Sequence, residues 1–181
     1  SYGIGSVDFG TSGTSYVQYA VNSFQLGTGP FTIETFLYFP SITSGSIVFS
    51  LYNNTTPNKT LHLELNGGPF PPDGRPSYVR VYVNGEYLIQ PISLPGTPGS
   101  LSKDTWNHLA IVKDSSGVIK CYINGFSDTN IINTASLDDI VNGFTIGDFS
   151  SLNGTSFTGY MTNFRVVTGS AVYTGPFTPP T

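Results

Sequence analysis

Hydrophobic and polar side chains alternate along much of this chain with a period of two residues. In residues 60–65 the three leucines fall on one side of an extended backbone, whereas His62 and Glu64 fall on the other. In residues 78–83 three valines alternate in the same way with two tyrosines and an arginine. A period of two is typical of a β-strand that buries one of its faces. This pattern predicts strands at residues 4–9, 15–20, 31–39, 46–52, 60–65, 78–84, 87–92, 105–114, 118–124, 143–148 and 157–167.

Turn residues separate these segments and predict how neighbouring strands connect. The pairs Asn84-Gly85 and Asn124-Gly125 suit the positive φ angles of a type I′ hairpin turn. A helical signal occurs at Ser136, which is placed to cap one short turn. Many short strands with turn residues between them predict an all-β fold, a two-sheet antiparallel β-sandwich.

Composition points to the same fold class. The 21 glycines and 13 prolines work against helices. Charged residues make up 10% of the chain, against about 25% in an ordinary soluble domain. Aromatic residues make up 14%, which argues against disorder. The 181 residues suit a single domain over 1–181, in which 173–181 is a candidate for the start of a linker.

Charge and hydropathy argue against two classes of partner. The net charge is −4 and no basic stripe is present, so the sequence predicts no binding to nucleic acid. No apolar run approaches the roughly 18 residues of a membrane span, so the sequence predicts no membrane partner either.

The chain starts at Ser1 rather than at a methionine, and we therefore expect an excised domain or a processed product.

Several segments resemble one known family in the order in which they occur. Residues 106–112 (WNHLAIV) and 122–125 (YING) look like its Trp-x-His strand and the hairpin that follows. The family is the laminin-G-like domains of the concanavalin A-like lectin/glucanase superfamily, and the resemblance implies a jelly roll with a convex and a concave sheet. The other matching segments are 6–9, 31–36, 144–147 and 157–166.

The closing run 165–180 (RVVTGSAVYTGPFTPP) is similar to repeats in bacteriophage and other virion proteins, and in some bacterial surface proteins. The similarity implies part of a tail fibre, appendage or capsid, or of a cell-surface protein. It therefore implies an extracellular or virion-surface location.

Glucanases of the superfamily carry paired acids on one strand, as Glu-x-Asp-x-x-Glu, because glycoside hydrolysis needs two carboxylates. This chain has three glutamates, Glu34, Glu64 and Glu86, and none has an acid two residues away. Adjacent Asp138 and Asp139 would face opposite ways on a strand. The sequence therefore predicts that the protein is not an enzyme. We expect the Glu34 carboxylate to be held by hydrogen bonds or an ion pair within the structure.

The other reactive side chains favour packing over chemistry. His62 and His108 are the only histidines, and no serine has a nucleophile-elbow pattern around it. His108 and Trp106 lie on one strand, and we expect both to pack in the core. Cys121 alternates with isoleucines, so we expect it to pack as a small hydrophobe, and with these histidines it forms no zinc pattern.

Calcium is the one cofactor that the resemblance implies, since several relatives hold it at the rim through Asp, Asn and carbonyl oxygens. The candidate metal ligands lie in expected rim loops and are Asp73, Asp148 and Asn153. The alternative is that these side chains form turns with their own backbone.

Two sets of residues offer the aromatic faces and planar polar groups that bind sugars. The first lies on strand faces, provided that 60–65 and 78–84 are neighbours, and comprises His62, Glu64, Tyr78, Arg80 and Tyr82. The second lies in loops and comprises Asn53, Asn54, Phe70, Asp73 and Arg75. The alternative for the first set is an ordinary outer face with a Glu64–Arg80 ion pair and a ladder of tyrosines.

These observations predict a non-catalytic recognition module that binds glycans or a glycosylated cell surface. Its partner would be a cell-surface glycan or glycoprotein. The alternative is a structural decoration domain that binds other virion proteins or its own copies through sheet edges.

Overall fold

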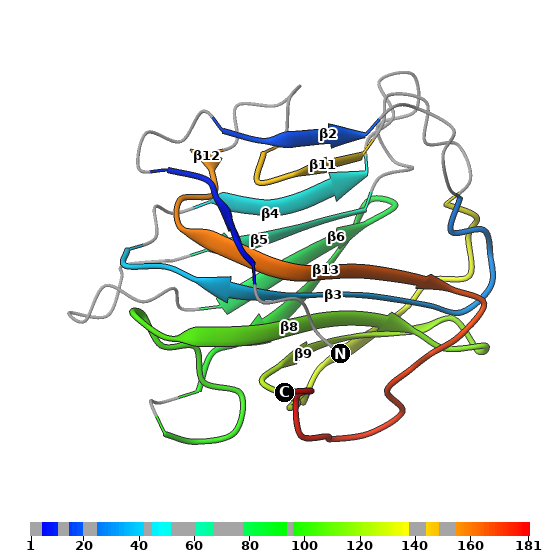
Figure 1. Ribbon diagram of the computed structural model, residues 1–181. Helices are drawn as coiled ribbons and strands as arrows, with labels where there is room; N and C mark the ends of the chain where they lie inside the picture. The colour runs from blue at the N-terminus through cyan, green and yellow to red at the C-terminus, as the bar shows by residue number, and fades with distance from the viewer. Residues whose placement is uncertain are drawn as a thin grey trace.

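The structure, a computed structural model, consists of two stacked β-sheets (Figure 1). Sheet A runs in the order β1 (Val7–Asp8), β13 (Tyr160–Thr168), β3 (Phe31–Tyr38), β8 (Trp106–Lys113), β9 (Val118–Ile123) and β10 (Asn130–Ile132). Sheet B runs in the order β2 (Val17–Tyr19), β11 (Phe144–Ile146), β4 (Ser46–Leu51), β5 (Leu61–Asn66), β6 (Tyr78–Val83) and β7 (Glu86–Pro91), with β12 (Thr155–Ser156) also beside β4. The structure describes residues 5–10, 15–19, 25–41, 45–51, 61–66, 78–93, 96–137, 144–148 and 155–181.

The predicted all-β sandwich is confirmed, and each expected strand has a counterpart. Neighbouring strands pair antiparallel, except that β12 runs parallel to β4. Two short strands, β10 and β12, were not predicted. Their two or three residues are too few to show an alternating pattern, so only pairing with a neighbour defines them. No helix within the described residues is long and apolar enough to cross a membrane.

Both Asn-Gly pairs form tight turns, as predicted. Asn84 and Gly85 have φ angles of 49° and 92°, and they join β6 to β7. Asn124 and Gly125 have φ angles of 49° and 81°, and they lead from β9 toward β10. The short helical turn expected from Ser136 onward would include residues 138–140, which lie outside the described residues.

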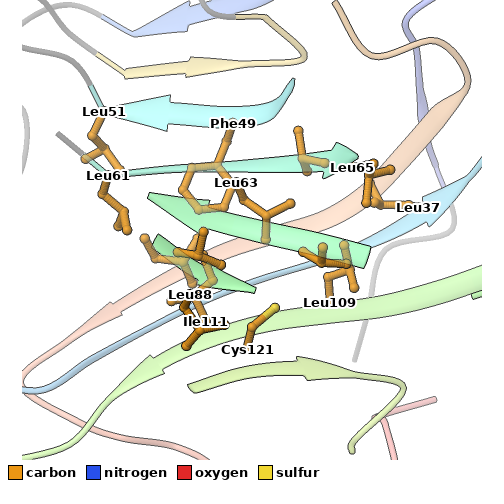
Figure 2. Packing of buried hydrophobic residues seen from close by; sticks show 14 of the residues in the cluster. Leu37, Phe49, Leu51, Leu61, Leu63, Leu65, Leu88, Leu109, Ile111 and Cys121 are labelled. Atoms are coloured by element: carbon orange, nitrogen blue, oxygen red, sulfur yellow. The ribbon is translucent and has the colours of Figure 1, made fainter. Parts of the chain in front are cut away.

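The main hydrophobic core lies between the two sheets (Figure 2). Leucines on the inner face of β5, such as Leu63, pack toward Leu109 and Ile111 of β8. Cys121 on β9 is fully buried in the same core, so its predicted role as a small hydrophobe is confirmed. A Leu side chain that is buried in this way contributes roughly 1.5–3 kcal/mol.

A second, smaller cluster lies on the outer face of sheet A, beneath the C-terminal tail (residues 169–181). Ala171, Tyr173 and Phe177 of the tail pack against Ala110, Val112 and Tyr122 of the sheet. The segment 173–181, which was a candidate for the start of a linker, therefore lies against the sheet. Figure 1 shows the tail, in red, folding back beside β8 and β9.

Candidate binding face

The strand set predicted from the sequence shares one face of sheet B. Strands β5 and β6 are neighbours, with Glu64 opposite Arg80 and His62 opposite Tyr82. Tyr78 follows on the same face, opposite Asn66. The shared face is confirmed, and the role of these residues in sugar binding stays a prediction.

The next strand, β7, extends this face with residues that the sequence analysis did not single out. Tyr87 lies opposite Tyr82, and Ile89 lies opposite Arg80. Tyr87 is 51% exposed and Ile89 is 48% exposed. The two-residue turn at Asn84-Gly85 fixes the register of β7 against β6, so the sequence held the signal for both positions. We call the outer surface of β5, β6 and β7 the sheet B face.

On the sheet B face, the positive charge of Arg80 is balanced by the carboxylate of Glu64. Arg80 Nη2 lies 2.5 Å from Glu64 Oε1, so the predicted cross-strand ion pair is present. The guanidinium also lies over the Tyr87 ring, 4.9 Å from its centroid. The Arg80 side chain is 31% exposed and that of Glu64 is 6% exposed, so the arginine is the accessible partner.

Three aromatic rings form a ladder across the same strands. The His62 and Tyr82 rings stack, with centroids 4.9 Å apart, and the Tyr82 and Tyr87 rings meet edge to face at 5.0 Å. Burial, together with the positive charge of Arg80, lowers the pKa of His62 to about 4. His62 is therefore neutral at pH values near 7, and it supports the tyrosines from a buried position.

The loop set and most of the calcium set fall outside the described residues. This applies to Asn53, Asn54, Phe70, Asp73, Arg75 and Asn153. Asp148 is described, and its backbone carbonyl accepts a 2.7 Å hydrogen bond from the Thr145 hydroxyl. Among the described residues no group of three or more His, Cys, Asp or Glu side chains is placed to hold a metal ion. Calcium stays a prediction.

Glu34 is bonded within the structure, as expected. Its Oε2 accepts a 2.6 Å hydrogen bond from the Tyr173 hydroxyl and lies 3.2 Å from His108 Nε2. Its Oε1 lies 2.5 Å from Arg165 Nη2. Burial acts to raise the pKa of Glu34, but the His108 and Tyr173 hydrogen bonds and the Arg165 charge lower it on balance. This carboxylate is 2% exposed and lies beneath the tail, which contacts it through the Tyr173 hydroxyl.

Two residues of the Trp-x-His strand have different environments. His108 is 1% exposed, and it packs beneath the tail on the outer face of sheet A rather than between the sheets. The expectation that Trp106 packs in the core was wrong, because Trp106 is 45% exposed. On β8 the core side belongs to Leu109 and Ile111, so Trp106 faces outward.

Comparison with known families gives one match over most of the chain. A family model described as the concanavalin A-like lectin/glucanases superfamily matches residues 11–171. Among curated proteins, none matches the chain.

Solved structures with a similar fold include three proteins of different kinds. One is the CBM40 module of Ruminococcus gnavus IT-sialidase bound to α2,3-sialyllactose (15% identity, 93% of this chain, 91% of that chain, TM-score 0.59). Another is the native heptameric SAP-like pentraxin from Limulus polyphemus (16% identity, 89% of this chain, 74% of that chain, TM-score 0.59). A third is mouse laminin α1 chain, domains LG4-5 (17% identity, 88% of this chain, 40% of that chain, TM-score 0.62). At these identities the likeness shows the fold alone.

Proposed function

Since the chain belongs to the concanavalin A-like lectin/glucanases superfamily, we propose that it is a non-catalytic recognition module that binds glycans through the sheet B face. The observation that carries the proposal is the strip on β6 and β7, where the Tyr87 ring contacts both the Tyr82 ring and the guanidinium of Arg80. The strip lies on paired strands of one sheet, so its geometry is set before a ligand arrives.

The chemistry of the strip suits a sugar. Tyrosine rings offer apolar faces for sugar C–H groups, and their hydroxyls offer hydrogen bonds. The Arg80 guanidinium presents several planar donors, while its charge is balanced by Glu64. A strip with donors and little net charge suits uncharged hydroxyl groups better than an anionic group. The sialyllactose complex of the Ruminococcus gnavus module supports the proposal, since it is a module of this fold that holds a glycan.

The position of the acids supports a non-catalytic role. Glu34 is engaged by three partners and covered, and Glu64 is engaged by Arg80. A retaining glycosidase needs two carboxyl groups about 5–5.5 Å apart at an open site. Glu34 is 2% exposed and Glu64 is 5% exposed, so neither lies at an open site.

We further propose that the module is displayed outside the cell, on a virion or a cell-surface protein. The similarity of residues 165–180 to repeats in such proteins supports this context. Its partner there is a cell-surface glycan or glycoprotein.

The test is glycan retention on an array, with Tyr87→Ala and Tyr82→Ala compared with the unaltered chain. Loss of a stacking ring is expected to weaken retention about tenfold. Tyr19→Ala is the matched control, because Tyr19 is a 60% exposed tyrosine on β2, at the other edge of sheet B. Unfolding by urea checks that each variant is folded.

The same array separates the alternatives. Retention that disappears with a calcium chelator would support the calcium site, and Arg75→Ala tests the loop set. If no glycan is retained with or without calcium, the recognition proposal is wrong and the structural or protein-interaction role takes its place.

A further inference from the structure

Three aromatic side chains form a row across the outer face of sheet A. Tyr160 lies opposite Tyr38, and Tyr38 lies opposite Trp106, so β13, β3 and β8 each contribute one ring. The Tyr38 and Tyr160 ring centroids are 5.9 Å apart, and those of Tyr38 and Trp106 are 5.7 Å apart. We call these three residues the aromatic row.

The aromatic row lies outside the part of this face that the C-terminal tail covers. The C-terminal tail packs over Ala110, Val112 and Tyr122, farther along β8 and β9. In Figure 1 the tail leaves the far end of β13, while the row lies where β13 and β8 begin. Trp106 is 45% exposed and Tyr160 is 39% exposed. Single exposed aromatic residues are ordinary, whereas these three form one continuous row of ring contacts.

Polar groups flank the row at both ends. Asp8 on β1 lies opposite Tyr160, and its Oδ1 accepts a 2.7 Å hydrogen bond from the Gly10 amide. At the other end, the exposed turn before Trp106 carries Lys103 and Asp104. A carboxylate beside an aromatic surface accepts hydrogen bonds from hydroxyl groups and repels anions. This arrangement suits an uncharged ligand with many hydroxyls and apolar C–H faces.

The size of the open area argues against a protein partner. Trp106 and Tyr160 together expose on the order of 200 Å². A stable protein–protein interface buries about 800 Å² on each partner. The row alone therefore supplies only about a quarter of such an interface, whereas it is large enough for a few sugar rings.

We propose that the aromatic row is a second glycan-binding site, which takes an uncharged oligosaccharide on the side of the molecule opposite the sheet B face. Each ring lies on its own strand, and the Tyr38 ring is inclined by 67° to that of Tyr160 and by 58° to that of Trp106. A sugar that stacks on one ring can therefore meet the edge of the next. The proposal does not depend on binding at the sheet B face, because the two surfaces share no residue. If both surfaces bind sugar, one module can hold two glycans at once. The overall affinity then increases when the two glycans are linked to each other.

The single tryptophan of the chain makes the test direct, because Trp106 belongs to the row. Neutral gluco-, manno-, galacto- and xylo-oligosaccharides are titrated into the protein while its tryptophan emission is followed. Stacking removes water from the indole, so we expect a saturable blue shift with at least one of these probes. Tyr160→Ala should weaken that binding about tenfold, and Tyr160→Phe should preserve it because the ring remains.

Two control variants show whether the emission shift comes from the aromatic row itself. Tyr82→Ala alters only the sheet B face, and Tyr19→Ala alters an exposed tyrosine on β2, so neither should change the titration. The proposal is overturned if no probe shifts the Trp106 emission, if Tyr160→Ala binds as well as the unaltered chain, or if Tyr82→Ala abolishes the shift. It is also overturned if sedimentation shows a dimer that Tyr160→Ala dissociates, because the row would then be a contact between copies.

Discussion

Two glutamates on the outer faces of the sheets, Glu34 and Glu64, are both buried in the folded chain. Glu34 is 2% exposed and Glu64 is 5% exposed, and each has an arginine at 2.5 Å, Arg165 and Arg80 respectively. The period of two correctly placed Glu64 on the face away from the core. Alternation within a strand gave no information on burial; for example, the group that covers Glu34 lies 139 residues farther along the chain, at Tyr173.

His62 makes the stability of the protein depend on pH. Its pKa is about 4 in the folded chain and about 6.5 in an unfolded chain. The unfolded state therefore binds more protons between these values, so stability is complete above about pH 6.5 and is lost as pH falls toward about 4. Between about pH 7 and about pH 5, urea unfolding should show a loss on the order of 2 kcal/mol from this residue.

The variant His62→Gln isolates this effect, because glutamine does not titrate. Its unfolding free energy should fall less over the same pH interval than that of the unaltered chain. Equal losses in the two proteins would mean that carboxylates, and not His62, cause the pH dependence.

At the scale of elements, two turns with the same sequence have different surroundings. Gly85 and Gly125 each occupy the second position of an Asn-Gly turn and have positive φ angles of 92° and 81°. A Cβ at Gly85 would meet no atom within 4 Å, whereas a Cβ at Gly125 would overlap the Phe177 carbonyl oxygen. The Phe177 amide also donates a 3.1 Å hydrogen bond to the Gly125 carbonyl. The second turn is therefore one of the contacts that hold the C-terminal tail.

Gly125→Ala should destabilise the protein more than Gly85→Ala. Both variants carry the strain of a left-handed alanine, roughly 1–2 kcal/mol. Gly125→Ala adds a steric clash worth roughly a further 1–3 kcal/mol, the usual cost of overpacking. Urea unfolding measures both costs, and limited proteolysis checks whether the tail has detached. Similar stabilities, with the tail equally protected, would show that the contact between Gly125 and Phe177 is dispensable.

At the scale of the whole molecule, the sandwich holds one thiol deep between its sheets. Cys121 is fully buried, and burial raises its pKa to about 12. The reactive thiolate is therefore scarce near neutral pH and out of reach of a reagent. Its exposure requires the two sheets to separate.

Thiol labelling of Cys121 should consequently report global unfolding. The native protein should resist iodoacetamide, and labelling should begin in the same range of urea concentration in which the Trp106 emission changes. Labelling at clearly lower urea would show that the sheets open locally around β9 before the molecule unfolds.

The sequence alone determined every strand except β10 and β12, and the two Asn-Gly turns. It also determined that His62 and Glu64 share one face of their strand, and that Tyr78, Arg80 and Tyr82 share one face of theirs. These features follow from local chemistry, namely a period of two and the φ preferences of Asn and Gly. The resemblance of short segments to laminin-G-like domains also predicted the superfamily, which the match over residues 11–171 confirms.

Only the tertiary structure decided which outward-facing residues are covered. Trp106 and His108 lie two residues apart on the same face of β8, yet the first is 45% exposed and the second is 1% exposed. The difference arises because the tail covers one position and leaves the other open. Exposure depends on segments that are distant in the sequence, and the alternation within a single strand carries no record of them.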